Sequence, residues 1–100
     1  MILNIVNKNS RQGSSLEDCL AQLSPGDALL LIEDGVLAAV DTTANQQWLQ
    51  RCPEDIALYV LQDDAVARGL EPYLIPRFHR IGYDEFVDLV EQFRLSQSWY

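Results

Sequence analysis

Two short, uninterrupted apolar runs constrain the fold of this chain more than any other feature. Residues 28–32 read ALLLI and residues 56–61 read IALYVL. Strands that are buried on both faces have continuous runs of this kind, whereas strands with one wet face alternate apolar and polar residues. The two runs therefore predict strands at the centre of a sheet that is covered on both sides.

Helical patterns separate these runs from each other and from two further strand candidates. ILNIV at 2–6 predicts a first strand, and RFHRI at 77–81 predicts a weaker one. Ser14 and Glu17 form an S-x-x-E capping box, which predicts that a helix starts there and ends before Ser24-Pro25-Gly26. Further helical pieces are expected in VLAAV after the Glu33-Asp34-Gly35 turn, in NQQWLQR, in DDAVARG with Gly69 as its C-terminal cap, and in YDEFVDLVEQF.

The last of these segments carries the strongest helical periodicity. Phe86, Val87, Val90 and Phe93 fall on one stripe at helical spacing, so they are expected to face the core. Strand and helix alternate along the chain, which favours an α/β fold with a mostly parallel sheet. We expect one domain over residues 1–100, a small three-layer sandwich with four to five strands. So small a sheet leaves edges and apolar surface uncovered, and this favours an assembly.

Charge and cysteine usage limit the classes of function. Fifteen acidic and seven basic residues leave a net charge of -8, which opposes direct binding to nucleic acid or to anionic membranes. The N-terminal apolar run is too short for a signal peptide, and no apolar window has the length of a membrane span. Two cysteines without a secretory signal indicate free thiols in a reducing compartment. We therefore expect a cytoplasmic protein.

Motifs of common enzymes and cofactor sites are absent from the sequence. It contains no GxGxxG, P-loop, GxSxG or HExxH pattern, and the single histidine, His79, has no cysteine or histidine nearby. We expect neither a metal nor a cofactor. Glu33-Asp34 and Asp63-Asp64 each follow an apolar strand, where open α/β sheets place ligands. A structural role in a turn and a helix cap is the alternative, and it is the one that we favour.

Cys19 and Cys52 are the only candidate nucleophiles of the thiol type. Leu16, Cys19, Leu20 and Leu23 share one apolar helical face, and free cysteine is often buried, so Cys19 is expected first as a core residue. Its acidic neighbours Glu17 and Asp18 oppose a thiolate. Cys52 precedes Pro53 in extended geometry, and nothing around it in the sequence indicates activation.

The order of these segments resembles a known family. IVNKNS, SLEDCL, LLLIEDGVLAAV, LYVLQDDAVARGL, IGYDEFVDLV and the terminal QSWY follow one another as in the DsrH/TusB family, the small subunits of the DsrEFH and TusBCD sulfur-relay complexes. The resemblance spans the whole chain and is weakest over 42–55 and 71–78. Cys19 matches a cysteine of the DsrH-like branch, whereas other TusB-like members have an apolar residue there.

The resemblance implies a docking subunit of a persulfide relay, in a dimer of heterotrimers with a DsrE/TusD-like and a DsrF/TusC-like chain. It implies that the principal acceptor cysteine lies on the larger partner, with Cys19 at most an accessory, sulfur-carrying thiol, so an enzymatic role for this chain is left open. The sulfur would serve 2-thiolation of the tRNA wobble uridine in the TusBCD case, or dissimilatory sulfur oxidation in the DsrEFH case.

A hypothesis of another class remains beside this one. The chain would then be a homo-oligomeric module that binds a small ligand at the strand ends through Glu33, Asp34 and Asp63. The C-terminal Ser98-Trp99-Tyr100 is expected to dock, either on this domain or on a partner, because two aromatic side chains would be costly in solvent.

Overall fold

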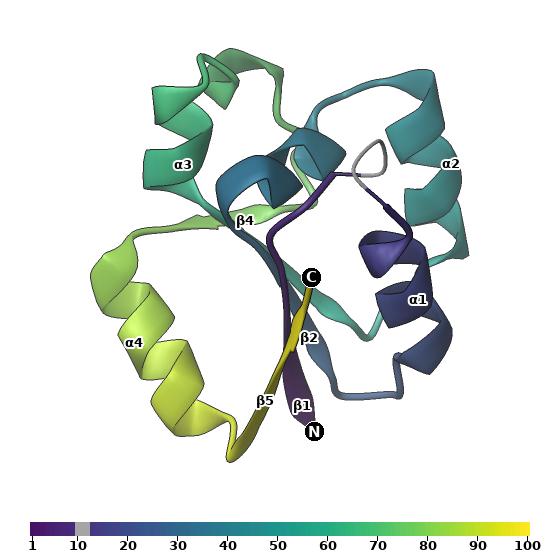
Figure 1. Cartoon of the computed structure of the whole chain (residues 1–100), viewed down its shortest axis with the longest axis vertical. Helices are drawn as coiled ribbons and strands as arrows, with labels where there is room; N and C mark the ends of the chain where they lie inside the picture. Colours follow the sequence, from purple (N-terminus) through teal and green to yellow (C-terminus); the bar gives the residue numbers. More distant parts are fainter. Residues whose placement is uncertain (10–12) are drawn as a thin grey trace.

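A computed structural model describes residues 1–9 and 13–100 and shows a five-stranded parallel sheet with helices on both faces (Figure 1). The strand order is β4-β3-β2-β1-β5, and every pair of neighbours is parallel. The predicted α/β fold is confirmed. The strands are β1 (Ile2–Val6), β2 (Ala28–Leu31), β3 (Ala57–Leu61), β4 (His79–Ile81) and β5 (Leu95–Trp99), and the helices are α1 (Ser15–Gln22), η1 (Glu33–Ala39), α2 (Thr43–Arg51), α3 (Gln62–Ala67), η2 (Glu71–Tyr73) and α4 (Tyr83–Gln92).

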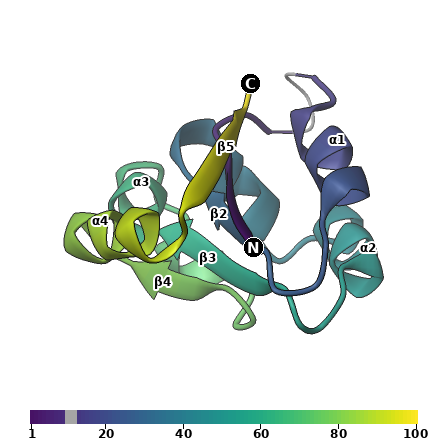
Figure 2. The ribbon, with the colours of Figure 1, turned by 90° about the horizontal axis from the view of Figure 1, so that it is seen from below.

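The direction of the connections decides which helix covers which face. From β1 to β4 each strand is added on the same side of the previous one, and the connecting helices therefore lie on one face of the sheet. The connection from β4 to β5 runs back across the sheet, so its right-handed crossover places α4 on the opposite face (Figure 2). One face thus receives three connections and the other only one.

Two apolar cores result from this arrangement. The larger core joins α1, η1, α2 and α3 to the sheet, and the smaller core joins α4 to it. The four residues of β2 are all completely buried, and they alternate between the two cores: Leu29 and Leu31 enter the larger, Ala28 and Leu30 the smaller. The continuous apolar run at 28–32 is explained by this two-sided burial.

The C-terminal tail docks on its own domain through Trp99, as one of the two expected alternatives had it, but Tyr100 is 77% exposed and does not dock. Residues Leu95–Trp99 form the edge strand β5 beside β1, with Trp99 opposite Val6. The indole Nε1 of Trp99 donates a hydrogen bond to Oδ1 of the buried Asn4, at 3.1 Å. The sequence does not predict this strand as such, because its residues are mostly polar and its pairing with β1 connects the two ends of the chain.

The predicted capping box at the start of α1 is wrong. Ser14 precedes the helix, but its side chain makes no capping hydrogen bond to the backbone; Oγ donates instead to Oδ2 of Asp18, at 2.9 Å. The Ser14 ψ of 13° departs from the extended geometry in which a serine hydroxyl reaches the N–H groups of the first turn. The helix itself forms where it was predicted.

The C-terminal cap at Gly69 is confirmed. Gly69 has a φ of 69°, a left-handed conformation that glycine adopts without steric cost. The N–H of Leu70 donates to the carbonyl of Ala65, and the N–H of Gly69 donates to the carbonyl of Val66. This pair of bonds is a Schellman motif, which ends α3.

The predicted inner stripe of α4 is partly wrong. Phe93 is buried and Phe86 is half-buried, as predicted, but Leu89 completes the inner face. Val87 is 57% exposed and Val90 is 41% exposed. The apolar arc of α4 is therefore wider than the part of the helix that the sheet covers.

Candidate functional site

Cys19 lies on the inner face of α1, in the larger core. Cys19 is completely buried and Leu16 is almost completely buried. Leu20 and Leu23 are partly buried and pack against the same core. The helical spacing that the sequence showed is thus the spacing of a packing face. Cys19 occupies the position of a small apolar residue.

The environment of Cys19 opposes a thiolate. The pKa of the Cys19 thiol is raised from 9.0 to about 12, mainly by burial, with smaller contributions in the same direction from the nearby Cys52 and Asp27. Because the thiolate is the nucleophilic form, the thiol in this conformation is protonated and inert at neutral pH. The sequence neighbours Glu17 and Asp18 are exposed and are not the cause of the shift.

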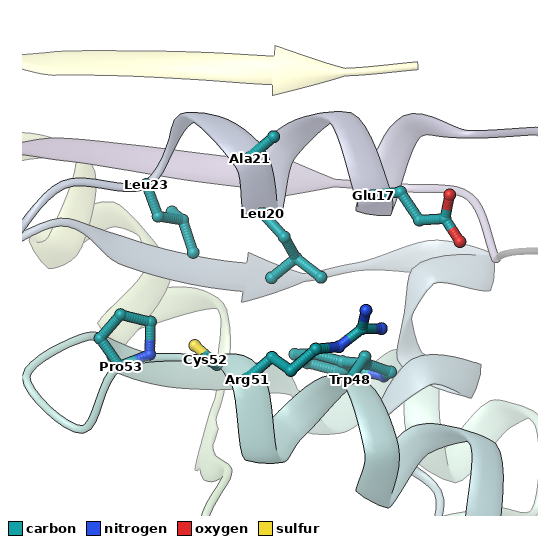
Figure 3. Close-up of a pocket in the computed structure, with 8 residues that line it drawn as sticks. All are labelled: Glu17, Leu20, Ala21, Leu23, Trp48, Arg51, Cys52 and Pro53. Atoms are coloured by element: carbon teal, nitrogen blue, oxygen red, sulfur yellow. The ribbon is translucent and has the colours of Figure 1, made fainter.

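Cys52 caps the C-terminal end of α2 and lines a pocket between α1 and α2 (Figure 3). The pocket has a volume of about 320 Å³. In the close-up, the side chains of Leu20 and Leu23 extend from α1 toward α2, where Trp48 and Cys52 lie. Its walls combine these side chains with Glu17, Ala21, Arg51 and Pro53. The pocket is therefore mainly apolar, with two charged groups beside one thiol.

Arg77 supports the backbone around Cys52. Its guanidinium donates to the carbonyl oxygen of Leu49 at 3.2 Å and to that of Pro53 at 2.8 Å. Burial raises the pKa of the Cys52 thiol, and the neighbouring Arg77 lowers it by a smaller amount. Cys52 is consequently not an activated nucleophile. The pocket was not predictable from the sequence, since two segments about thirty residues apart form it and neither carries a ligand-binding motif.

The acidic residues at the strand ends join η1 to α3. The backbone N–H of Glu33 donates to Oδ2 of Asp64, at 2.6 Å. Arg68 donates from Nη2 to Oδ1 of Asp34 at 2.9 Å and from Nη1 to the Asp64 carbonyl at 3.2 Å. The arrangement ties two neighbouring connections together at the carboxyl ends of β2 and β3, so these acids have a structural role, as the sequence favoured. The predicted helix cap at Asp63 or Asp64 is wrong, because Leu61 is the N-cap of α3 and both acids lie in its first turn. Asp63 is exposed on α3.

The turn at Glu33 is unusually tight. Glu33 has a φ of 50°, a left-handed conformation that is uncommon outside glycine. Two residues later, a Cβ on Gly35 would overlap the carbonyl oxygen of Val6. Glycine is therefore required where η1 crosses the end of β1.

His79 lies on the edge strand β4, and its side chain is 69% exposed. Its Nε2 is 4.0 Å from Oε2 of Glu85, and its ring packs edge-on against Tyr59. Within residues 1–9 and 13–100 no group of three His, Cys, Asp or Glu side chains is arranged to hold a metal ion. No helix in this described part of the chain has both the length and the apolar character to cross a bilayer.

Comparisons with known proteins agree with the resemblance. The family model described as "DsrH like protein" matches residues 8–96. Protein TusB of Serratia proteamaculans is 46% identical over 74 residues, which are 74% of this chain and 76% of that protein. Protein TusB of Erwinia tasmaniensis is 39% identical over 84 residues, or 84% of this chain and 86% of that protein.

The fold comparison finds a solved structure with the same architecture. The solution structure of protein Tm0979 from Thermotoga maritima superposes with a TM-score of 0.64 and 26% sequence identity, covering 92% of this chain and 93% of that one. A family model over most of the chain and relatives well above 30% identity identify the family. The chain belongs to the DsrH family, whose members are sulfur-relay subunits.

Proposed function

We propose that this chain is a docking subunit of a cytoplasmic persulfide-relay complex that supports 2-thiolation of the tRNA wobble uridine. Its partners in this proposal are a DsrE/TusD-like and a DsrF/TusC-like subunit, in a dimer of heterotrimers. Membership of the DsrH family supports the relay, and the relatives named TusB favour the branch that the resemblance connects with tRNA.

The burial of Cys19 is the observation that carries the docking role. Transfer of a persulfide is attack by a thiolate on sulfur, which requires an accessible thiol with a pKa near ambient pH. Cys19 is completely buried and its pKa is raised to about 12. The relay thiol is therefore expected on the larger partner. Cys19 would serve as an accessory thiol only in a conformation in which α1 moves away from the sheet.

The net charge of -8 agrees with this role, since an acidic chain is suited to contact other proteins rather than tRNA itself. Dissimilatory sulfur oxidation remains the alternative pathway, because the matching family model bears the DsrH name. The hypothesis of a homo-oligomeric module that binds a ligand through Glu33, Asp34 and Asp63 gains no support from the strand ends, because the Asp34 carboxylate is bonded to Arg68 within the chain.

Complementation of a deletion strain tests the proposal. In the organism that encodes this chain, deletion of its gene should abolish 2-thiouridine at the wobble position, as measured by mass spectrometry of digested tRNA. Wild-type protein and a Cys19→Ala variant should both restore it. Unchanged thiouridine in the deletion strain would contradict the tRNA branch, and failure of a folded Cys19→Ala variant would contradict the docking role.

A further inference from the structure

Helix α4 presents a second apolar stripe beside the one that packs on the sheet. Phe86, Leu89 and Phe93 contribute to the smaller core. Tyr83, Val87 and Val90 follow one another at i, i+4 and i+7, and they are 54%, 57% and 41% exposed. Three large apolar side chains in one row on an otherwise charged helix form a continuous stripe, not scattered surface residues.

The stripe faces the part of the sheet that no helix covers. On the other flank of α4, Oε2 of Glu85 lies 4.0 Å from Nε2 of His79, so that flank faces the edge strand β4. Helical geometry places Tyr83, Val87 and Val90 across the helix from Glu85, toward β1 and β5. Figures 1 and 2 both show α4 beside β4 and diverging from β5.

The sheet surface on this side is itself partly apolar and open. Ile5 and Ile32 pack against the smaller core and are only partly buried. Ser96 and Ser98 of β5 are paired with Leu3 and Ile5, so they share the same face, and both are exposed. Two strands span about 10 Å, because neighbouring strands lie about 4.8 Å apart, and this matches the diameter of a helix. Leu3 of β1 is completely buried in the smaller core, so the room for one helix beside α4 lies over β5 and over Ile5, toward the end of β1.

Charge distinguishes between the candidate occupants. Asp84, Glu85, Asp88 and Glu91 are exposed on α4, and the helix contains no basic residue. A second copy of the chain docked through the same face would bring these acids together, in a protein that already has a net charge of -8. A different chain with basic residues around an apolar stripe is complementary.

We propose that Tyr83, Val87, Val90, Ile5 and Ile32, here called the α4–β1 strip, dock an amphipathic helix of a partner subunit whose apolar face is bordered by Lys or Arg. The inference rests on the proposed function, because it assigns a place on this chain to the relay complex. It also explains why α4 keeps apolar residues on a flank that its own sheet leaves exposed.

Paired substitutions in the strip test the inference. The full chain, as wild type or as Val87→Glu/Val90→Glu, is mixed with the purified DsrE/TusD-like and DsrF/TusC-like subunits, and the Kd is measured by biolayer interferometry. Val66→Glu is the matched control, since Val66 is also an exposed valine, at 49%, but lies on α3. Thermal unfolding followed by circular dichroism checks that each variant is folded.

The strip variant should unfold at the wild-type temperature and bind the partners at least about tenfold more weakly, as expected for residues central to an interface. Val66→Glu should bind like wild type. Replacing Asp88 by Asn and Glu91 by Gln should reduce the salt dependence of the Kd. Wild-type affinity in a folded strip variant, or an equal loss in Val66→Glu, would overturn the strip while leaving the relay role intact. Absence of binding by the wild-type chain would overturn both.

Discussion

Native Cys19 should be almost unreactive toward alkylating reagents, and the size of the effect follows from its environment. The perturbation is Cys52→Ala, which leaves Cys19 as the only thiol of the chain. Only the thiolate reacts, and the pKa of Cys19 is raised from 9.0 to about 12. At a fixed pH, each unit by which the pKa rises lowers the thiolate fraction about tenfold, so at neutral pH native Cys19 should be about a thousandfold less ionised than an ordinary cysteine.

Iodoacetamide labelling followed by intact-mass spectrometry measures this directly. The variant is labelled at pH 7 in buffer and in urea, where the unfolded chain provides the reference rate. Native labelling should be at least about a thousandfold slower, because burial excludes the reagent in addition to the pKa shift. The converse variant, Cys19→Ala, reports Cys52 separately. Native Cys19 labelling within about tenfold of the unfolded rate would refute the assignment of Cys19 as a core residue.

Three further substitutions or conditions test the packing. Because the pKa of Cys19 is raised in the folded state, the thiol of the unfolded chain loses its proton first as pH rises. This group should leave the free energy of unfolding unchanged below about pH 9 and lower it by up to about 1.4 kcal/mol per pH unit above that. Urea titrations of wild type and Cys19→Ala at several pH values measure the difference. Equal losses in both proteins would contradict this. Gly35→Ala places a Cβ against a backbone carbonyl of β1 and should lower the free energy of unfolding by more than about 2 kcal/mol, as measured by thermal melts. A Cβ at Gly82 meets no atom within 4 Å, so Gly82→Ala should lower the free energy of unfolding far less. Trp99→Phe removes the hydrogen bond to the buried Asn4 side chain. The free energy of unfolding should fall by about 1–3 kcal/mol, and amide hydrogen exchange in β5 should become faster. Unchanged exchange would show that this bond does not hold the strand in place.

The parallel sheet was predictable from sequence because its central strands are buried on both sides. The run at 28–32 has no polar residue, and only a two-sided burial explains such a run in a chain of 100 residues. The edge strand β5 was not predictable in the same way. Its residues Leu95–Ser98 are exposed, so they carry no apolar pattern, and the pairing with β1 depends on a contact between the two ends of the chain.

The same limit applies to the candidate sites. Cys19 was predictable as a core residue, since its neighbours on the helix repeat at the spacing of a buried face. The pocket beside Cys52 and the exposed positions of Val87 and Val90 were not, because each depends on where a second element lies. Helical periodicity shows that α4 has an apolar arc, but only the geometry of the sheet shows how much of that arc is covered.

Sulfur loading of the reconstituted complex tests the central claim most directly. The three subunits are mixed with an upstream persulfide donor, and each chain is examined by intact-mass spectrometry. A mass gain of one sulfur atom should appear on the larger partner subunit, and neither its extent nor its rate should change when this chain carries Cys19→Ala. Addition of one sulfur atom to this chain, lost in Cys19→Ala, would contradict the account and make Cys19 a relay thiol.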